Sequence, residues 1–308
     1  MALTRADAKQ STAQQKPYVL KVLATLAAVQ KLLDETSSDI HDAVMRSSSG
    51  GTVNNESQLV SDIKALLAIY FAAMNEVTDA GVKAVITVRV NQAVEQVLPV
   101  LRVAGANNEA NSFSAQINNY PQQAVSRYHA MQTGPYNLSY DDRTAALALS
   151  AVKVSQALIQ YGQDKGQSAS DISLNLARYI NPTPTQQAQR PWSAIRQRFQ
   201  YVDNAIPADV MAGSFQTNVY DLERTISGDM YRQATDEFYA DKPWAEGFDW
   251  VLSATHEIED VCDDNEAANP YGPDDAQPDS HNFCLCDWVV RVMSIDDIAA
   301  LVDGGDLS

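Results

Sequence analysis

Apolar residues recur at helical spacing along most of this 308-residue chain. Spacings of three and four residues place side chains on one face of an α-helix, and that face must pack against another element. Early in the chain the pattern comprises Val22, Leu26, Val29 and Leu33. Further along it comprises Leu147, Ala151, Val154 and Leu158. The sequence therefore predicts a mostly α-helical protein.

Segments with the composition of turns and loops separate the helical stretches. Residues 47–57, SSSGGTVNNES, predict a loop. A long helical region is expected over residues 58–103, with a break near Thr78–Gly81. Gly105 and the Asn-rich run ANNEANS are expected to end this region, and the segments NNYPQQ and TGPYNLS predict further breaks around a short helix. We therefore divide the sequence into a helical N-terminal region, residues 1–135, and a second domain, residues 136–308.

The second domain begins with three predicted helices. The first covers residues 138–162. The second begins at a capping box formed by Ser168 and Asp171, and it ends at Asn181-Pro182 because proline cannot continue a helix. The third covers residues 215–239.

Only two runs in the chain have the composition of β-strands, namely FDWVLS (residues 248–253) and CDWVVRVM (residues 286–293). Between them lies a polar connection, residues 254–283, whose large apolar side chains are Ile258, Val261, Tyr271 and Phe283. A connection of about 30 polar residues is unusual in a compact domain unless something holds it in place. The second domain is therefore predicted to be α+β, with a β-hairpin and a loop that needs a stabilising element.

This connection and the start of the second strand hold all three cysteines of the chain and two of its four histidines. If the strands pair as antiparallel neighbours, the ends of the connection meet, and Cys262 approaches His281, Cys284 and Cys286. Three sulfurs and one imidazole nitrogen suit tetrahedral Zn²⁺, which can supply on the order of 10 kcal/mol of folding free energy. We expect a structural zinc site here. The alternatives are buried free thiols and redox chemistry, whereas a disulfide between Cys284 and Cys286 would close a strained ring.

A catalytic site is the alternative function for the same segment. HEIED (His256–Asp260) is similar to the H-E-x-x-H motif of zinc proteases, with aspartate in the last position. That motif needs a helix, whereas these residues follow a strand and precede a turn. The alternative is a zinc hydrolase with Glu257 as its base. The pairs Asp263/Asp264 and Asp274/Asp275 lack EF-hand spacing and are predicted to form a solvated acidic face.

The negative charge of the chain is concentrated near its end. The whole sequence has 39 acidic and 22 basic residues, and the stretch from Asp236 onward has 19 acidic residues against two basic ones, Lys242 and Arg291. Such a segment lacks the basic patch that nucleic-acid binding requires, so we expect no sequence-specific nucleic-acid binding. It is expected either to face a basic partner or to be a solvated surface.

Three blocks of the second domain carry a resemblance to a known family. The first is LSYDDR with a following helix and GQSASDISLNLARYINP (Gly166–Pro182), and the second is LERTISGDMYRQA (Leu222–Ala234). The third is GFDWVLSATHEIEDVCDDNEAANPYG together with PDSHNFCLC. In this order the blocks resemble the phage head morphogenesis family, the Mu protein F-like minor head proteins. The third block is similar to that family's Trp-containing strand, its His…Asp-x-Cys-Asp segment and its closing His-Pro-x-Cys-x-Cys. The resemblance covers about residues 138–293.

The sequence departs from the family pattern at three positions. Ile226 stands where the family has Glu, Asn282 stands where it has Pro, and Asn265 occupies a position that is a second cysteine in many members. These departures leave His256 beside His281 as a candidate zinc ligand.

The resemblance implies a minor structural protein of a tailed-phage head, without enzymatic activity. Such a protein associates with the portal protein or the major capsid protein, assists assembly or DNA delivery, and resides in the virion after assembly in the host cytoplasm. We expect no membrane-spanning segment, because the most apolar run, Ala65–Met74, is too short. We also expect no secretory signal, because MALTRADAKQ has no apolar core. Besides the zinc hydrolase, an acidic adaptor that binds a basic partner is the remaining alternative.

Overall fold

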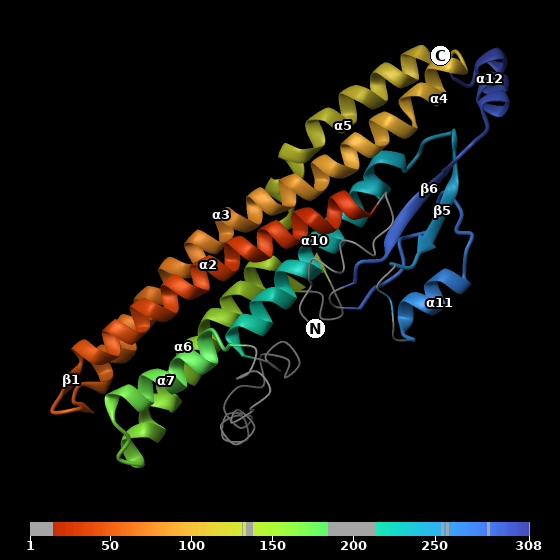
Figure 1. The fold of residues 1–308 in the computed structure, drawn as a ribbon. Helices are drawn as coiled ribbons and strands as arrows, with labels where there is room; N and C mark the ends of the chain where they lie inside the picture. Colours follow the sequence, from red (N-terminus) through yellow and green to blue (C-terminus); the bar gives the residue numbers. More distant parts are fainter. Residues whose placement is uncertain are drawn as a thin grey trace. The chain divides into compact units, whose positions relative to one another are not determined.

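The structure is a computed structural model that describes residues 15–130, 132–133, 138–183, 214–253, 256, 259–281 and 284–307. Most of these residues are helical, as predicted (Figure 1). The helices up to residue 183 are α2 (Lys16–Arg46), α3 (Glu56–Gln96), α4 (Leu98–Val103), α5 (Asn107–Tyr128), α6 (Tyr140–Asp164) and α7 (Ala169–Ile180). Those that follow are α10 (Phe215–Tyr239), α11 (Val261–Ala267) and α12 (Ile295–Gly304).

Three antiparallel strand pairs complete the described fold. The larger pair, β5 (Ala245–Val251) and β6 (Asp287–Val292), is the predicted hairpin. Two further pairs have only two residues per strand, and the sequence did not predict them as strands. They are β1 (Ser48–Ser49) with β2 (Thr52–Val53), and β3 (Gln132–Thr133) with β4 (Leu138–Ser139).

The chain forms two compact units. The first unit consists of Met1–Thr25, Asp79–Tyr140 and Glu223–Ser308, and the second unit consists of Leu26–Thr78 and Asp141–Leu222. Each unit therefore combines segments from before and after residue 135. The division of the sequence into residues 1–135 and 136–308 does not coincide with these units, and it stays a prediction.

The second unit contains helix α7, whose start and end the sequence predicted. Ser168 caps α7 through the predicted capping box, since its side chain accepts from the amide of Asp171 and the Asp171 side chain bonds back. The helix ends at Asn181, as expected. Elsewhere in the second unit, Tyr70 of α3 packs edge-on against Phe215 of α10, with ring centroids 5.4 Å apart.

The long helical region ends at Val103, just before Gly105, as predicted. The helix α5 in the first unit begins at Asn107 and runs through NNYPQQ, so the predicted break at NNYPQQ is wrong. Proline in a helix interior removes one hydrogen bond and costs about 3 kcal/mol, yet Pro121 lies inside α5. The helix persists because it has a buried stripe at helical spacing: Ala110, Phe113, Ile117, Tyr120, Ala124 and Tyr128. Burial of this stripe outweighs the unfavourable local composition.

The predicted break near Thr78–Gly81 is also wrong, because α3 runs through it. A Cβ atom at position 81 would lie 2.5 Å from Oγ1 of Thr25 on α2. Gly81 therefore allows α2 and α3 to approach closely within the first unit, and it does not end a helix.

Among the described residues, one helical stretch, Glu56–Val103, is long and apolar enough to cross a membrane. A single stretch of this kind is weak evidence, since the core helices of soluble proteins have the same length and composition. Several of its apolar side chains are buried, among them Ile63, Leu67 and Met74. The absence of a membrane-spanning segment stays a prediction.

The hairpin is fixed to the helices of the first unit by a buried ion pair. Arg89 on α3 places Nη2 2.7 Å from Oδ1 of Asp287 at the start of β6, and it also donates to the carbonyl of Trp288. Its Nε donates to Oγ1 of Thr235 on α10 over 2.7 Å. Because Asp287 follows Cys286 directly, these contacts fix the position of the last cysteine in space.

A second buried carboxylate on α10 leads to a prediction about pH. Burial raises the pKa of Asp236 from 3.8 to about 6, although a hydrogen bond from Nε1 of Trp288, 2.6 Å long, lowers it. A carboxyl group whose pKa is higher in the folded state contributes stability below about pH 3.8, and that stability is lost as the pH rises through about 6.

Asp236→Asn is expected to raise the free energy of unfolding at pH 7 by about 2 kcal/mol, since asparagine is neutral and still accepts from Trp288. Denaturant unfolding of both proteins at pH 4 and pH 7 measures this. The gain should shrink toward pH 4, and a variant less stable than the wild type at pH 7 would contradict it.

Candidate metal centre

The antiparallel hairpin brings the ends of the polar connection together, as the sequence predicted. Trp250 of β5 pairs with Trp288 of β6, and Val251 pairs with Asp287. Cys286 therefore lies beside the end of β5, where the amide of Ser253 reaches its sulfur over 3.5 Å. The connection is not a plain loop, because it contains the helix α11, which the sequence did not predict.

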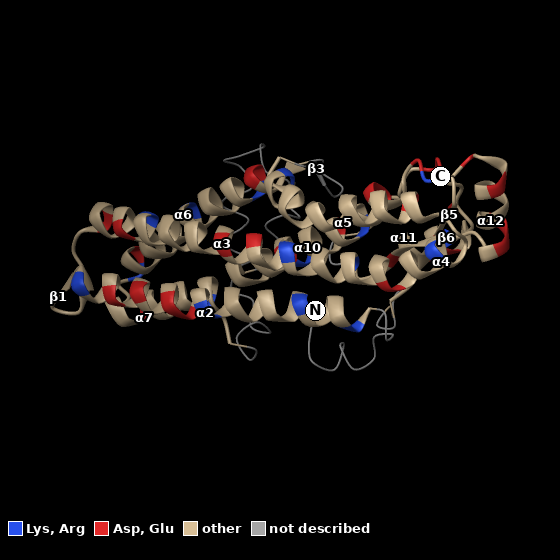
Figure 2. Cartoon of the chain, turned by 90° about the horizontal axis from the view of Figure 1, so that it is seen from above, with Lys and Arg blue, Asp and Glu red and all other residues tan. Residues whose placement is uncertain are grey.

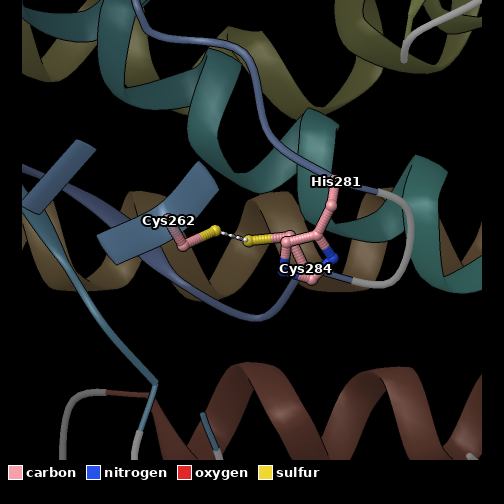
Figure 3. A group of neighbouring side chains, drawn as sticks. All are labelled: Cys262, His281 and Cys284. Atoms are coloured by element: carbon pink, nitrogen blue, oxygen red, sulfur yellow. Dashed lines mark hydrogen bonds between the residues drawn. The ribbon is translucent and has the colours of Figure 1, made fainter. Parts of the chain in front are cut away.

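Cysteine and histidine side chains from two segments meet at this place. Cys262 comes from the first turn of α11, whereas His281 and Cys284 come from the segment that leads into β6 (Figure 3). The sulfurs of Cys262 and Cys284 are 3.4 Å apart, and both lie within 4.8 Å of one ring nitrogen of His281. This arrangement could hold a metal ion.

The third thiol belongs to the same cluster. The amide of Cys286 donates to the sulfur of Cys284 over 3.3 Å, and the thiol of Cys286 is close enough to shift the pKa of both other thiols. The three cysteines are almost inaccessible to solvent, with exposed fractions of 0% for Cys262, 1% for Cys284 and 2% for Cys286. The three sulfurs therefore lie close together beside His281, and the ligand atoms of Cys262, Cys284 and His281 lie within 4.8 Å of one another.

The hydrogen bonds within the cluster shift the pKa values of the three thiols in different directions. Bonds from Cys262 and Cys286 lower the pKa of Cys284 well below its ordinary value, against the effect of burial, and Arg232 lowers it further. Bonds to Cys284 and Cys286, together with burial, raise the pKa of Cys262. The bond with Cys262 lowers the pKa of Cys286, but Cys284 and burial raise it to about 12. The cluster thus favours a thiolate at Cys284 with two thiol donors, and a thiolate is the form that binds metals.

Helix α10 supports the cluster from outside through Arg232. Its Nη1 donates to the carbonyl oxygens of Cys284 and Cys286, over 3.5 and 3.2 Å. Its Nη2 donates to Oδ1 of Asp229 over 2.6 Å and to Oγ of Ser280 over 2.9 Å. Contacts of this kind orient metal ligands without touching the metal.

The approach of α10 to the cysteine segment requires a glycine. A Cβ atom at position 228 would lie 2.8 Å from the carbonyl oxygen of Cys284. Any side chain there would move the helix away and lengthen the contacts of Arg232. Gly228 and Arg232 belong to the second of the three family-like blocks, and Cys284 belongs to the third. The two blocks are therefore in contact in the folded chain.

The N-terminus of α11 positions Cys262. Oδ1 of Asp260 accepts from the amide of Cys262 over 2.8 Å, and Oδ2 of Asp263 accepts from the amide of Asp260 over 2.7 Å. This reciprocal capping box fixes the first turn of a short helix. The expectation that Asp263 belongs to a solvated acidic face is therefore incomplete, because its carboxylate also pairs with His256.

The structure distinguishes the two candidate histidine ligands. His281 lies with Cys262 and Cys284, whereas His256 contacts carboxylates, with Nε2 2.8 Å from Oδ2 of Asp263. His256 is part of another group with Asp260 and His281. Asn265, at the position of the family's additional cysteine, is buried and donates to the carbonyl of Asp279 over 2.8 Å. The departure at Asn282 lies outside the described residues.

The described part of HEIED is not helical, in agreement with the sequence. His256 and residues 259–260 have no helical conformation, and α11 begins only at Val261. Glu257, the expected base of a zinc hydrolase, lies outside the described residues. His256 and Asp260 are thus not presented on one helix face, which is the arrangement that H-E-x-x-H chemistry requires.

Acidic residues predominate in the C-terminal stretch that contains the candidate centre. Figure 2 shows acidic residues and no Lys or Arg on α12, whose sequence IDDIAALVDG contains three aspartates. The two basic residues in the C-terminal stretch are both paired, Lys242 with Glu109 at 3.5 Å and Arg291 with Asp249 at 3.4 Å. The field of this segment therefore favours cations.

Comparisons of the chain with protein-family models, with curated proteins and with solved structures find no match.

The sequence did not identify Arg232, Asp260 or Asp263 as residues of the centre. Asp260 and Asp263 have the spacing of a capping box before Cys262, which is a local signal that could have been used. Arg232 lies 30 positions before Cys262, and no spacing in the sequence links the two.

Proposed function

We propose that Cys262, His281, Cys284 and Cys286 bind one structural zinc ion. Thiolate and imidazole ligands suit Zn²⁺ better than Ca²⁺ or Mg²⁺, which prefer oxygen. Four protein ligands close a tetrahedral site, whereas a catalytic zinc keeps one position open for water or substrate. Burial of all three thiols supports a closed site. The ion would supply folding free energy to a segment that has little apolar surface of its own.

We further propose that the chain is a minor capsid or head morphogenesis protein of a tailed phage. The order of the three blocks supports this role. The observation that carries it is the contact of Arg232, in the second block, with the carbonyl oxygens of Cys284 and Cys286 in the third. Two blocks that are separate in the sequence therefore act as one structural feature. The proposal therefore rests on the sequence likeness of blocks that lie in contact in the folded chain, and fold by itself does not define function.

In this proposal the chain associates with the portal protein or the major capsid protein and assists assembly or DNA delivery. It has no catalytic turnover. The acidic stretch from Asp236 onward would face a basic surface of that partner, because duplex DNA is repelled by it.

The test is the composition of purified particles from the source that encodes this chain. Particles purified on a density gradient should contain the chain in few copies, detected by mass spectrometry beside the major capsid protein. A soluble early protein of the same source is the control for contamination. If the chain is recovered only in the soluble fraction, the capsid role is wrong.

A further inference from the structure

A second group of metal-binding side chains lies next to the thiols. His256, Asp260 and His281 each offer a ligand atom, and these atoms lie within 4.8 Å of one another. Nε2 of His281 is 3.2 Å from Oδ2 of Asp260, and Nε2 of His256 is 4.0 Å from Oδ1 of the same residue. Oδ2 of Asp263 lies 2.8 Å from Nε2 of His256 and holds that side chain next to the group.

We propose that His256, Asp260 and His281 form an outer site, which binds a divalent metal ion before it reaches the thiols. The inference rests on the zinc site proposed above and is independent of the capsid role. It assigns to His256 and Asp260 a function in metal entry.

Exposure separates the two groups. The side chains of Asp260, His281 and His256 are 30%, 35% and 10% exposed, whereas the three cysteines are at most 2% exposed. An ion that arrives from solvent can therefore contact the outer group directly. The thiols are accessible only after the ion has passed this group or after the segment has opened.

The ligands of the outer group suit a weak site for the same ion. Imidazole nitrogens and carboxylate oxygens bind Zn²⁺ and Co²⁺, but three ligands leave a coordination position open for exchange. Thiolates bind Zn²⁺ more strongly than carboxylates, because soft sulfur ligands match this ion. The equilibrium position of the ion is therefore the thiol site.

His281 connects the two sites because it belongs to both groups. An ion held by His281 can exchange Asp260 and His256 for Cys262 and Cys284 while it keeps one protein ligand. Such a stepwise exchange avoids a free ion at any stage. The surrounding carboxylates raise the local concentration of cations, which favours the first step.

The experiment measures the rate at which metal-free protein takes up Zn²⁺ from a weak chromophoric chelator in a stopped-flow instrument. Asp260→Asn removes the carboxylate charge but keeps an oxygen that can cap α11, since asparagine is a good N-cap residue. Asp264→Asn is the matched control, because Asp264 is exposed, lies in the same helix and is not in the outer group. We expect uptake to slow about tenfold in Asp260→Asn and to stay unchanged in Asp264→Asn.

A second variant, His256→Ala, should also slow uptake about tenfold. In both variants the final zinc content should stay at one ion per chain, and the Co²⁺-loaded proteins should keep the thiolate-to-metal absorption of the wild type. Equal rates for Asp260→Asn and Asp264→Asn would overturn the outer site. Loss of tight zinc in His256→Ala would also overturn it, because His256 would then be a ligand of the thiol site.

Failure of the zinc site and failure of the outer site have different signatures. If the thiols bind no zinc, the wild-type protein loaded with Co²⁺ has no thiolate absorption. The outer site is then tested in Cys284→Ser, which should still bind Co²⁺ weakly through nitrogen and oxygen ligands. Adding Asp260→Asn to that variant should abolish the residual binding, and unchanged binding would overturn the proposal.

Discussion

Cys284→Ser is expected to release the zinc ion and to lower the free energy of unfolding by at least about 3 kcal/mol. The sulfur of Cys284 contacts the thiol of Cys262 and accepts from the amide of Cys286, and Cys284 is the cysteine whose pKa is lowered, so its sulfur is the centre of the cluster. A hydroxyl group is a poor ligand for Zn²⁺ at neutral pH and cannot replace the thiolate. Part of the free energy of metal binding is therefore lost from folding.

Loss of the zinc ion should first destabilise the segment around α11, before the whole first unit unfolds. Residues 259–281 contain only the short helix α11, and the described segment around it has few buried apolar side chains. Amide hydrogen exchange of this segment should become much faster in the variant, while α3 and α10 keep their protection. Denaturant unfolding with and without a chelator measures the total effect on stability.

The control for Cys284→Ser is a buried hydroxyl group placed elsewhere in the first unit. Ala124→Ser introduces one at a fully buried position of α5, and serine in a helix can bond to the carbonyl four residues earlier. We expect it to cost about 1 kcal/mol and to leave the zinc content unchanged. A chelator should destabilise the wild type and this control but not Cys284→Ser. Equal destabilisation by the two substitutions, with no zinc in the wild type, would contradict the zinc site.

The sequence predicted the elements whose signals are local. Alternating and β-branched residues around Trp250 and Trp288 indicated both strands, and pairing of those strands was enough to bring Cys262 toward Cys284. The capping box at Ser168 and the end of α7 at Asn181 were also predicted, because capping depends on residues three or four positions apart. The residues of the cluster followed from these local features and from one assumption about long-range contacts, namely that the two strands pair as antiparallel neighbours.

The missed elements depend on contacts that are distant in the sequence. Pro121 indicated a break, but the buried stripe on α5 outweighed it through contacts such as that of Phe113 with Trp244. Gly81 indicated a break and instead allows close approach to Thr25. For the same reason Arg232 appeared to be an ordinary helix residue, since only the folded chain places it beneath Cys284 and Cys286.

Arg232→Met is expected to lower the free energy of unfolding by about 3–5 kcal/mol, because it removes one partner of a buried ion pair. The side chain of Arg232 is 1% exposed, and that of Asp229 is 14% exposed. The variant leaves the Asp229 carboxylate without the guanidinium and removes a donor from the carbonyls of Cys284 and Cys286. Because those carbonyls orient two of the ligands, zinc affinity should fall about 10- to 100-fold as well.

Two comparisons separate the position of Arg232 from the general effect of losing an arginine. Arg127 pairs with Glu237 at 2.8 Å in the same unit, but its side chain is 54% exposed, so Arg127→Met should cost less than about 1 kcal/mol and leave zinc affinity unchanged. Arg232→Lys keeps the charge near Asp229 but cannot reach that carboxylate and both carbonyls together, because it lacks the planar fork of donors. It should therefore recover part of the stability and little of the zinc affinity. If Arg232→Lys restores both to wild-type values, the charge of Arg232 alone supports the centre, and the hydrogen bonds to the cysteine carbonyls have no role in holding the metal ligands.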